Sequence, residues 1–193
     1  CYSKLSLYKT KDSYIIDEAE PIETFFGLRE DLERISLAQY FSELIMTLVQ
    51  EEEIAEEYLR LMLNSLHFLS KGTMPPEQIK AITELRMMCI AGYMPNLIAC
   101  ERCGEYETDT MYFSVEDGLL YCDNCISSDA MFHLDIGLVK ALRHIAFSEF
   151  DKIYSFKMED YALPDLSYIT EKYLLAQLQR NFKTLDFYNS IKV

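Results

Sequence analysis

Residues 100–125 have the sequence CERCGEYETDTMYFSVEDGLLYCDNC, which contains two Cys-x2-Cys pairs. The first pair is Cys100 and Cys103, and the second pair, Cys122 and Cys125, follows after a gap of 18 residues. A gap of roughly 15–20 residues between two such pairs is typical of four-cysteine zinc sites. The spacing therefore predicts one Zn²⁺ ion per chain, held by these four thiolates.

The segment between the two pairs has the pattern of a β-hairpin. Residues 111–115 and 119–121 are predicted strands, and Glu116-Asp117-Gly118 is the predicted turn that brings the second pair back to the first. Gly104, directly after Cys103, permits the left-handed backbone that a cysteine turn requires. Because four thiolates leave no open position on zinc, the site is predicted to be structural and not catalytic.

Other interpretations of the cysteines are weaker. Two disulfides would require an oxidising compartment, and the chain shows no basic and apolar leader. Redox-active Cys-x2-Cys motifs usually occur singly, at a helix start in a βαβ unit. An iron–sulfur cluster stays open as an alternative, because thiolate softness does not separate it from zinc.

Helical periodicity surrounds the cysteine segment on both sides and predicts a mainly α fold. A broad apolar stripe covers residues 37–49, a second covers about 53–70, and Pro75-Pro76 begins a third helix that ends near Gly92 or Pro95. Short connections between these helices predict an antiparallel bundle. Two further helices are predicted at about 135–148 and from Pro164 to about Asn181.

The N-terminal segment has a different pattern. Residues 4–20 alternate as two short strands around a polar turn. Two strands do not form a stable sheet alone, and few further strands are predicted downstream. The chain also begins at Cys1 and not at a methionine. We therefore expect residues 1–22 to be the end of a β-domain whose beginning is missing, followed by a helical domain at 23–193 with the cysteine segment, 96–133, inserted in it.

Composition limits the classes of function. The 193 residues carry a net charge of −14, which argues against non-specific binding to nucleic acid as the default. Residues 136–193 are nearly neutral, with 7 acids and 8 bases, so a surface for a polyanion is expected there or in a part of the protein outside this sequence. No apolar run approaches the roughly 20 residues of a membrane span, and no phosphate-binding loop or hydrolase motif is present. Neither a membrane protein nor an enzyme is expected.

The nearly neutral segment holds the candidate DNA contacts. Lys140 and Arg143 are one turn apart on a predicted helix, and aromatic residues surround Lys152 and Lys157. The aromatic residues in question are Phe147, Phe150, Tyr154, Phe156, Tyr161 and Tyr168. Aromatic side chains that lie between basic residues can stack on nucleobases. They can equally pack helices together under a long loop. The four cations are likewise either DNA contacts or ordinary solubilising charges.

The chain resembles the bacterial recombination mediator family RecO. The resemblance rests on 32–40 (LERISLAQY), on the CERCG motif at 100–104, on Phe113-Ser114 and Gly118, and on the CDNC motif at 122–125. The family often has two glycines before the second cysteine pair, where this chain has Asp117-Gly118. The resemblance implies that residues 1–22 are the last strands of a truncated OB-fold barrel, followed by a helical domain with a zinc-finger insertion.

The resemblance also implies a function. RecO proteins bind single- and double-stranded DNA, anneal complementary strands, and act with RecR and the single-stranded-DNA-binding protein to load a recombinase at gaps. They are non-enzymatic proteins of the bacterial cytoplasm and nucleoid. A different class of function stays open: a zinc-stabilised scaffold for protein interactions, with no direct DNA contact in this segment.

Overall fold

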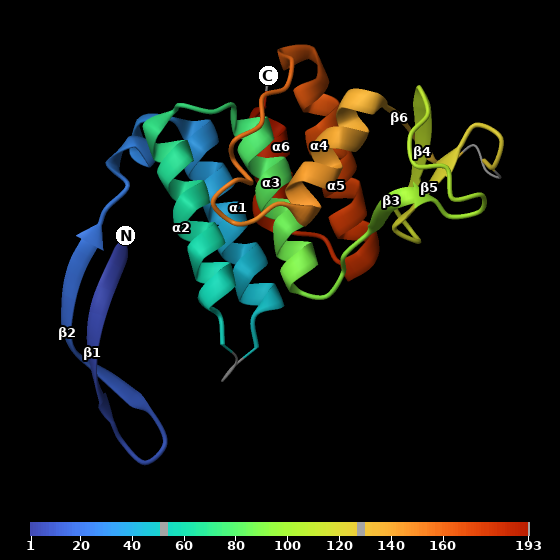
Figure 1. The fold of residues 1–193 in the computed structure, drawn as a ribbon. Coiled ribbons are helices and arrows are strands. Elements are labelled where there is room, and N and C mark those ends of the chain that lie inside the picture. The colour runs from blue at the N-terminus through green and yellow to red at the C-terminus, as the bar shows by residue number, and fades with distance from the viewer. Residues whose placement is uncertain (51–53, 127–129, 193) are drawn as a thin grey trace.

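The computed structural model describes residues 1–50, 54–126 and 130–192, and its parts lie in a row (Figure 1). A two-stranded hairpin lies at one side, a bundle of helices lies in the middle, and a four-stranded sheet lies at the other side. The predicted mainly helical class is confirmed. None of the described helices is both long enough and apolar enough to cross a membrane.

The described part of the chain forms six α-helices and two short 3-10 helices. Their bounds are η1 (Phe26–Glu30), α1 (Leu32–Leu48), α2 (Glu56–Lys71), α3 (Pro76–Ile90), α4 (Ile136–Phe147), η2 (Asp160–Ala162), α5 (Leu163–Leu178) and α6 (Lys183–Ile191). The predicted start of the second helix at residue 53 lies outside the described residues.

Local sequence explains the helix ends. The Asp31 side chain accepts hydrogen bonds from the N–H groups of Glu33 and Arg34, at 2.8 and 3.2 Å, and so caps α1. Gly72 ends α2 in the left-handed conformation, at φ 63°. The Pro75-Pro76 pair begins α3 as predicted, because proline suits the first turn of a helix.

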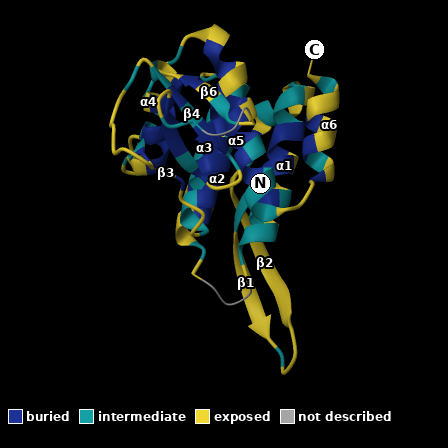
Figure 2. Cartoon of the chain, turned by 90° about the vertical axis from the view of Figure 1, so that its right-hand side faces the viewer, coloured by how far each residue is buried: buried dark blue, intermediate teal, exposed yellow. Residues whose placement is uncertain are grey.

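The third helix is the centre of the bundle. Helices α1, α2, α4 and α5 all pack against α3, and ten of its fifteen residues are buried. Figure 2 shows the buried residues concentrated in this helical part, whereas the hairpin is exposed. When a helix is covered on most sides, its side chains must be apolar, or its buried polar side chains must pair with one another or with neighbouring elements.

A buried ionic network supplies that pairing. Lys80 Nζ lies 2.9 Å from Glu84 Oε1 and 2.9 Å from Glu171 Oε2. The hydroxyl groups of Tyr40 and Thr170 donate hydrogen bonds to the Glu84 carboxylate, at 2.9 and 2.7 Å. The network joins α1, α3 and α5. The sequence predicts no such network, because an i,i+4 pair of opposite charges usually lies on an exposed helix face.

The helix predicted from Pro164 to about Asn181 is confirmed as α5, and a further helix, α6, follows it that the sequence did not predict. Helix α5 ends at Leu178, and Gln179 adopts a left-handed conformation at φ 48°. The chain then turns back, and α6 packs against α1, where the N–H of Thr184 donates to Glu43 Oε2 at 3.1 Å. No glycine or proline between residues 178 and 183 marks this break in the sequence.

The cysteine segment forms a sheet of four strands. They are β3 (Asn96–Cys100), β4 (Thr110–Ser114), β5 (Leu119–Cys122) and β6 (Phe132–Asp135), in the spatial order β3-β5-β4-β6. Strands β4 and β5 are the predicted hairpin, and Gly118 takes a positive φ of 69° in its turn. Strand β3 pairs parallel with β5, and β6 pairs antiparallel with β4; the sequence predicted neither outer strand.

The N-terminal hairpin consists of β1 (Tyr2–Lys9) and β2 (Tyr14–Glu23), which pair only with each other among the described residues. Leu7 pairs with Ile16, and Leu5 pairs with Ala19, so their side chains share one face. Leu5, Leu7 and Ile16 are each about half exposed. The prediction that these strands lack further strand partners in this chain is confirmed for the described residues, while their membership of an OB-fold barrel stays a prediction.

Candidate functional site

The four cysteines of the two Cys-x2-Cys pairs meet at one end of the small sheet. Cys100 ends β3 and Cys122 ends β5, and these two strands are neighbours. Cys103 and Cys125 follow each strand by one turn. The four Sγ atoms all lie within 4.8 Å of one another. The predicted four-cysteine cluster is therefore present.

Two tight turns aim the sulfur atoms at one point. After Cys100, the N–H of Gly104 bonds to the Cys100 carbonyl at 2.9 Å, and Gly104 has a φ of 76°. After Cys122, the N–H groups of Cys125 and Ile126 bond to the Cys122 carbonyl at 2.9 and 3.0 Å. The left-handed conformation at Gly104 explains why a residue without a side chain follows the first pair.

The sulfur spacing fits a tetrahedral metal ion and does not fit a disulfide. Cys103 Sγ lies 3.6 Å from Cys122 Sγ. A tetrahedron with Zn–S bonds of about 2.3 Å has sulfur–sulfur edges of about 3.8 Å. A disulfide would require about 2.05 Å. The donor set of four thiolates also suits zinc by its softness.

The electrostatics of the cluster favour a bound cation. Burial disfavours the Cys100 thiolate, but hydrogen bonds from the backbone N–H groups of Cys103, Cys122 and Arg102 outweigh burial and lower the pKa of the Cys100 thiol to about 6. Hydrogen bonding to the Cys103 sulfur and burial raise the pKa of the Cys125 thiol to about 12. Four thiols so close together do not all lose their protons unless a cation compensates the charge.

Arg143 of α4 holds the small sheet against the helical bundle. Its guanidinium donates hydrogen bonds to the carbonyl oxygens of Leu97 at 2.7 Å, Ile98 at 2.9 Å and Tyr106 at 2.6 Å. The same group lies 4.2 Å from the centre of the Tyr106 ring. Since Leu97 and Ile98 belong to β3, which ends at the first cysteine, Arg143 connects the cysteine cluster to α4.

The expectation that Arg143 forms an exposed basic pair with Lys140 is therefore wrong. Only 9% of Arg143 is exposed, and its Nε and Nη2 atoms donate to three carbonyl groups. Helical spacing correctly placed the two side chains near one face, and both approach the Glu107 carboxylate, at 3.4 Å for Lys140 and 3.9 Å for Arg143. The sheet covers Arg143 and leaves Lys140 in solvent.

The other three candidate DNA contacts are exposed. Lys140 pairs with Glu107, and Lys152 pairs with Glu149 at 2.8 Å. Lys157 is exposed and has no carboxylate partner among the described residues. Exposed ion pairs contribute little energy, so Lys140 and Lys152 can exchange their partners for phosphate oxygens.

The aromatic residues of the same region divide into two groups. The Tyr154 ring stacks on Phe68 at 4.6 Å and its hydroxyl bonds to Ser65 at 2.8 Å, so it packs the segment after α4 onto the bundle. Tyr161 and Tyr168 are 78% and 51% exposed. The packing interpretation thus holds for Tyr154 and in part for Tyr168, whose ring lies 5.8 Å from that of Phe132, whereas the Tyr161 ring is mostly exposed.

We expect Arg143→Met to lower the free energy of unfolding by about 2–4 kcal/mol, because it removes three buried hydrogen bonds from a charged donor. Lys140→Met is the matched control on the same helix, and its exposed ion pair predicts a change below about 1 kcal/mol. Urea unfolding of both variants measures the difference. Equal effects of the two substitutions would contradict the assigned role of Arg143.

The fold is a bundle of helices that carries a small sheet with four clustered cysteines, which defines the class of domain but not its function. Its family is shown by comparison with known proteins: residues 29–186 match the family described as "Recombination protein O C terminal", and the chain belongs to this family. The resemblance to RecO is confirmed.

Curated relatives support the same assignment over nearly the whole chain. A protein of Acetivibrio thermocellus named "DNA repair protein RecO" is 33% identical over 192 residues, covering 99% of this chain and 76% of the relative. Proteins of the same name from Caldicellulosiruptor bescii and Alkaliphilus metalliredigens are 30% and 29% identical. They are matched over 99% and 98% of this chain, and each alignment covers 78% of the relative.

Proposed function

We propose that this chain is a non-enzymatic DNA repair protein. It binds single- and double-stranded DNA, anneals complementary strands and helps to load a recombinase during recombinational gap repair. The observation that carries the proposal is the match to the recombination protein O family, whose relatives are named for DNA repair. Annealing needs only charge neutralisation and strand alignment, so it requires no catalytic group.

We propose that the four cysteines, Cys100, Cys103, Cys122 and Cys125, hold one structural Zn²⁺ ion. The support is their sulfur spacing and the repulsion that four thiolates would otherwise suffer. When bound, the ion would join the ends of β3 and β5 and complete the sheet. A closed set of four sulfur ligands leaves no position for substrate, so its role would be structural.

We propose that residues 1–22 complete an OB-fold barrel and that the helical domain begins at residue 23, with the zinc-finger insertion at 96–133. The support is the exposed apolar face of the hairpin, formed by Leu5, Leu7 and Ile16. Apolar side chains exposed on one face of two strands are expected to pack against further strands.

We propose that the exposed cations Lys140, Lys152 and Lys157 contact DNA phosphates. They lie on α4 and on the segment that follows it, which is the nearly neutral part of an otherwise acidic chain. Each lysine that neutralises a phosphate releases counterions, and this release makes affinity fall with salt.

A salt titration of the full chain tests the DNA contacts. Replacing Lys140, Lys152 and Lys157 together with alanine should weaken binding to a single-stranded oligonucleotide. It should also reduce the slope of log K against log salt by about two units, or roughly 0.7 per phosphate contact. Fluorescence anisotropy measures both quantities. Lys192→Ala, at the residue that follows α6 and pairs with Glu77, is the matched control and should leave the slope unchanged. An unchanged slope in the triple variant would assign DNA binding to another surface.

We further propose that the protein acts in the bacterial cytoplasm, at the nucleoid, with a RecR-like partner and a single-stranded-DNA-binding protein. A scaffold for protein interactions without DNA contact in this segment is the second candidate function. The ion pairs that already occupy Lys140 and Lys152 favour it, because paired cations attract phosphate less strongly. Binding of a RecR-like partner without affinity for DNA would support this second candidate.

A further inference from the structure

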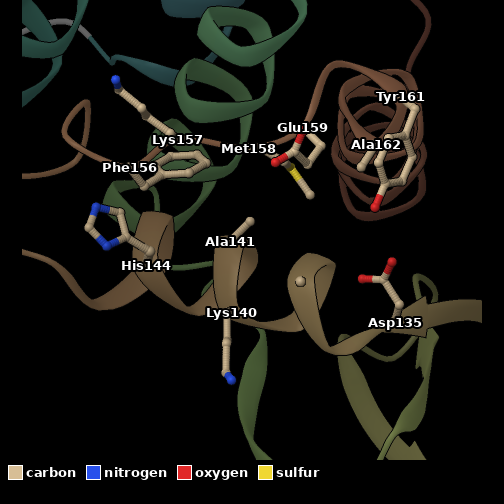
Figure 3. A pocket seen from close by; sticks show the side chains of 11 residues that line it. Asp135, Lys140, Ala141, His144, Phe156, Lys157, Met158, Glu159, Tyr161 and Ala162 are labelled. Atoms are coloured by element: carbon tan, nitrogen blue, oxygen red, sulfur yellow. The ribbon is translucent and has the colours of Figure 1, made fainter.

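A pocket lies between α4 and the segment that follows it. Its volume is about 400 Å³, which is within the usual range for small-ligand sites. Figure 3 shows the side chains that line it. They are Asp135, Gly137, Lys140, Ala141, His144, Phe156, Lys157, Met158, Glu159, Tyr161 and Ala162. The lining combines apolar side chains, such as Phe156 and Met158, with charged ones.

The segment that faces α4 across the pocket has no regular secondary structure, but contacts with the helical bundle fix its position. Tyr154 is stacked on Phe68 and hydrogen-bonded to Ser65, as described above. The Gln78 side chain of α3 donates to the Phe156 carbonyl at 2.9 Å. These contacts come from α2 and α3, so the pocket is preformed, and little ordering would be needed when a ligand enters.

Aromatic and imidazole rings are fixed at one end of the pocket. His144 Nε2 lies 2.9 Å from the Lys152 carbonyl, and the His144 ring lies 5.0 Å from that of Phe156. In Figure 3 the side chain of Lys157 starts next to Phe156, and its ammonium group points away from the two rings. Lys157 is exposed and has no carboxylate partner among the described residues, so this end of the pocket has an unpaired cation at its edge.

The opposite end carries carboxylates and the exposed Tyr161 ring (Figure 3). One oxygen of Asp135 accepts a hydrogen bond from the N–H of Leu138, at 2.8 Å, and the other bonds to no further described residue. Glu159 is exposed and its carboxylate is likewise free of described partners. This end can therefore accept hydrogen bonds from amino groups, and it repels carbonyl oxygens.

We propose that this pocket takes one unpaired nucleobase of single-stranded DNA, stacked on Tyr161, with the adjoining phosphate at Lys157. The proposal rests on the proposed DNA-binding function and adds a base preference to it. Carboxylates accept hydrogen bonds from the amino group of cytosine, whereas thymine presents a carbonyl oxygen at the same position. The pocket should therefore prefer cytosine to thymine.

Two oligonucleotides of equal length and charge test this preference. The full chain should bind an oligo-dC strand several-fold more tightly than an oligo-dT strand at the same salt concentration. Tyr161→Ala should weaken oligo-dC binding at least about fivefold, the lower end for the loss of one stacked base. Tyr161→Phe should retain the affinity, and Glu159→Gln should reduce the preference for dC. Tyr93→Ala, another exposed tyrosine at the end of α3, is the matched control and should change nothing.

A second readout locates the base directly. An oligonucleotide with 5-iodo-deoxycytidine should photocross-link to Tyr161 or Phe156, as identified by mass spectrometry of the digested complex. Equal affinity for dC and dT, or unchanged binding by Tyr161→Ala, would overturn the pocket assignment while leaving the DNA-binding function intact. If the unaltered chain binds neither strand, the proposed DNA-binding function fails, and the pocket assignment fails with it.

Discussion

Replacing Cys122 with serine is expected to abolish zinc binding and to unfold the four-stranded sheet. Serine does not provide a thiolate, and three remaining sulfur ligands bind zinc far more weakly. In small zinc domains, metal binding contributes about 10–16 kcal/mol, so we expect the folded sheet to depend on the proposed ion. The buried core is continuous with the sheet, but most of its residues belong to the helices around α3, so the helical bundle should stay folded.

Two measurements check this expectation. Metal analysis should find about one zinc per unaltered chain and almost none in Cys122→Ser. Amide hydrogen exchange should increase across β3–β6 and stay slow in α3. Cys89→Ser is the matched control, because Cys89 lies on α3, away from the cluster, and should retain the zinc. An unaltered chain purified under reducing conditions that contains no zinc, or that forms two disulfides, would refute the proposed site.

The cysteine cluster could be predicted from the sequence because its determinants are local. Each pair is three residues apart, and the hairpin between the pairs is set by an alternating pattern and by a turn that contains Gly118. Helices α1 to α5 were predicted for the same reason, since apolar periodicity and proline or glycine at the ends are local properties. Strands β3 and β6 are only five and four residues long, and their pairing depends on chain far away.

The role of Arg143 could not be predicted because it depends on what covers α4. Helical spacing places Lys140 and Arg143 near each other, but it does not show that β3 lies against that face. The same limit applies to Lys80 and Glu84, which have the spacing of an exposed ion pair and are 1% and 0% exposed. In each case the partner, a carbonyl of β3 or the carboxylate of Glu171, lies more than 40 residues away.

The second large effect is a loss of stability, expected when the buried ionic network around Lys80 loses its cation. Lys80→Met should lower the free energy of unfolding by about 3–5 kcal/mol, because it leaves the carboxylates of Glu84 and Glu171 buried without their cation. For a chain of this size, the melting temperature should fall by about 10 °C. Urea unfolding and thermal melting measure the change. Lys192→Met removes the more exposed ion pair with Glu77 and should cost less than about 1 kcal/mol.

A double substitution separates the unpaired charge from lost packing. Combining Lys80→Met with Glu84→Gln removes the central carboxylate charge, so the double variant should be more stable than Lys80→Met alone. The amide oxygen can accept a hydrogen bond from one of the Tyr40 and Thr170 hydroxyl groups, and the amide NH2 group can donate to the oxygen of the other. If the double variant is less stable than the single one, burial of the Glu84 charge is not the cause of the loss.

The pH dependence of Lys80→Met provides an independent test. Burial raises the pKa of Glu84 above its ordinary value even though Lys80 opposes the shift, and removal of Lys80 should raise it further. Between the unfolded pKa, about 4.3, and the raised native value, the native state holds a proton that the unfolded state releases, so stability falls as pH rises. The destabilisation by Lys80→Met relative to the unaltered chain should therefore be smaller at about pH 5 than at about pH 8. A destabilisation that is constant over this range would show that Glu84 does not carry the unpaired charge.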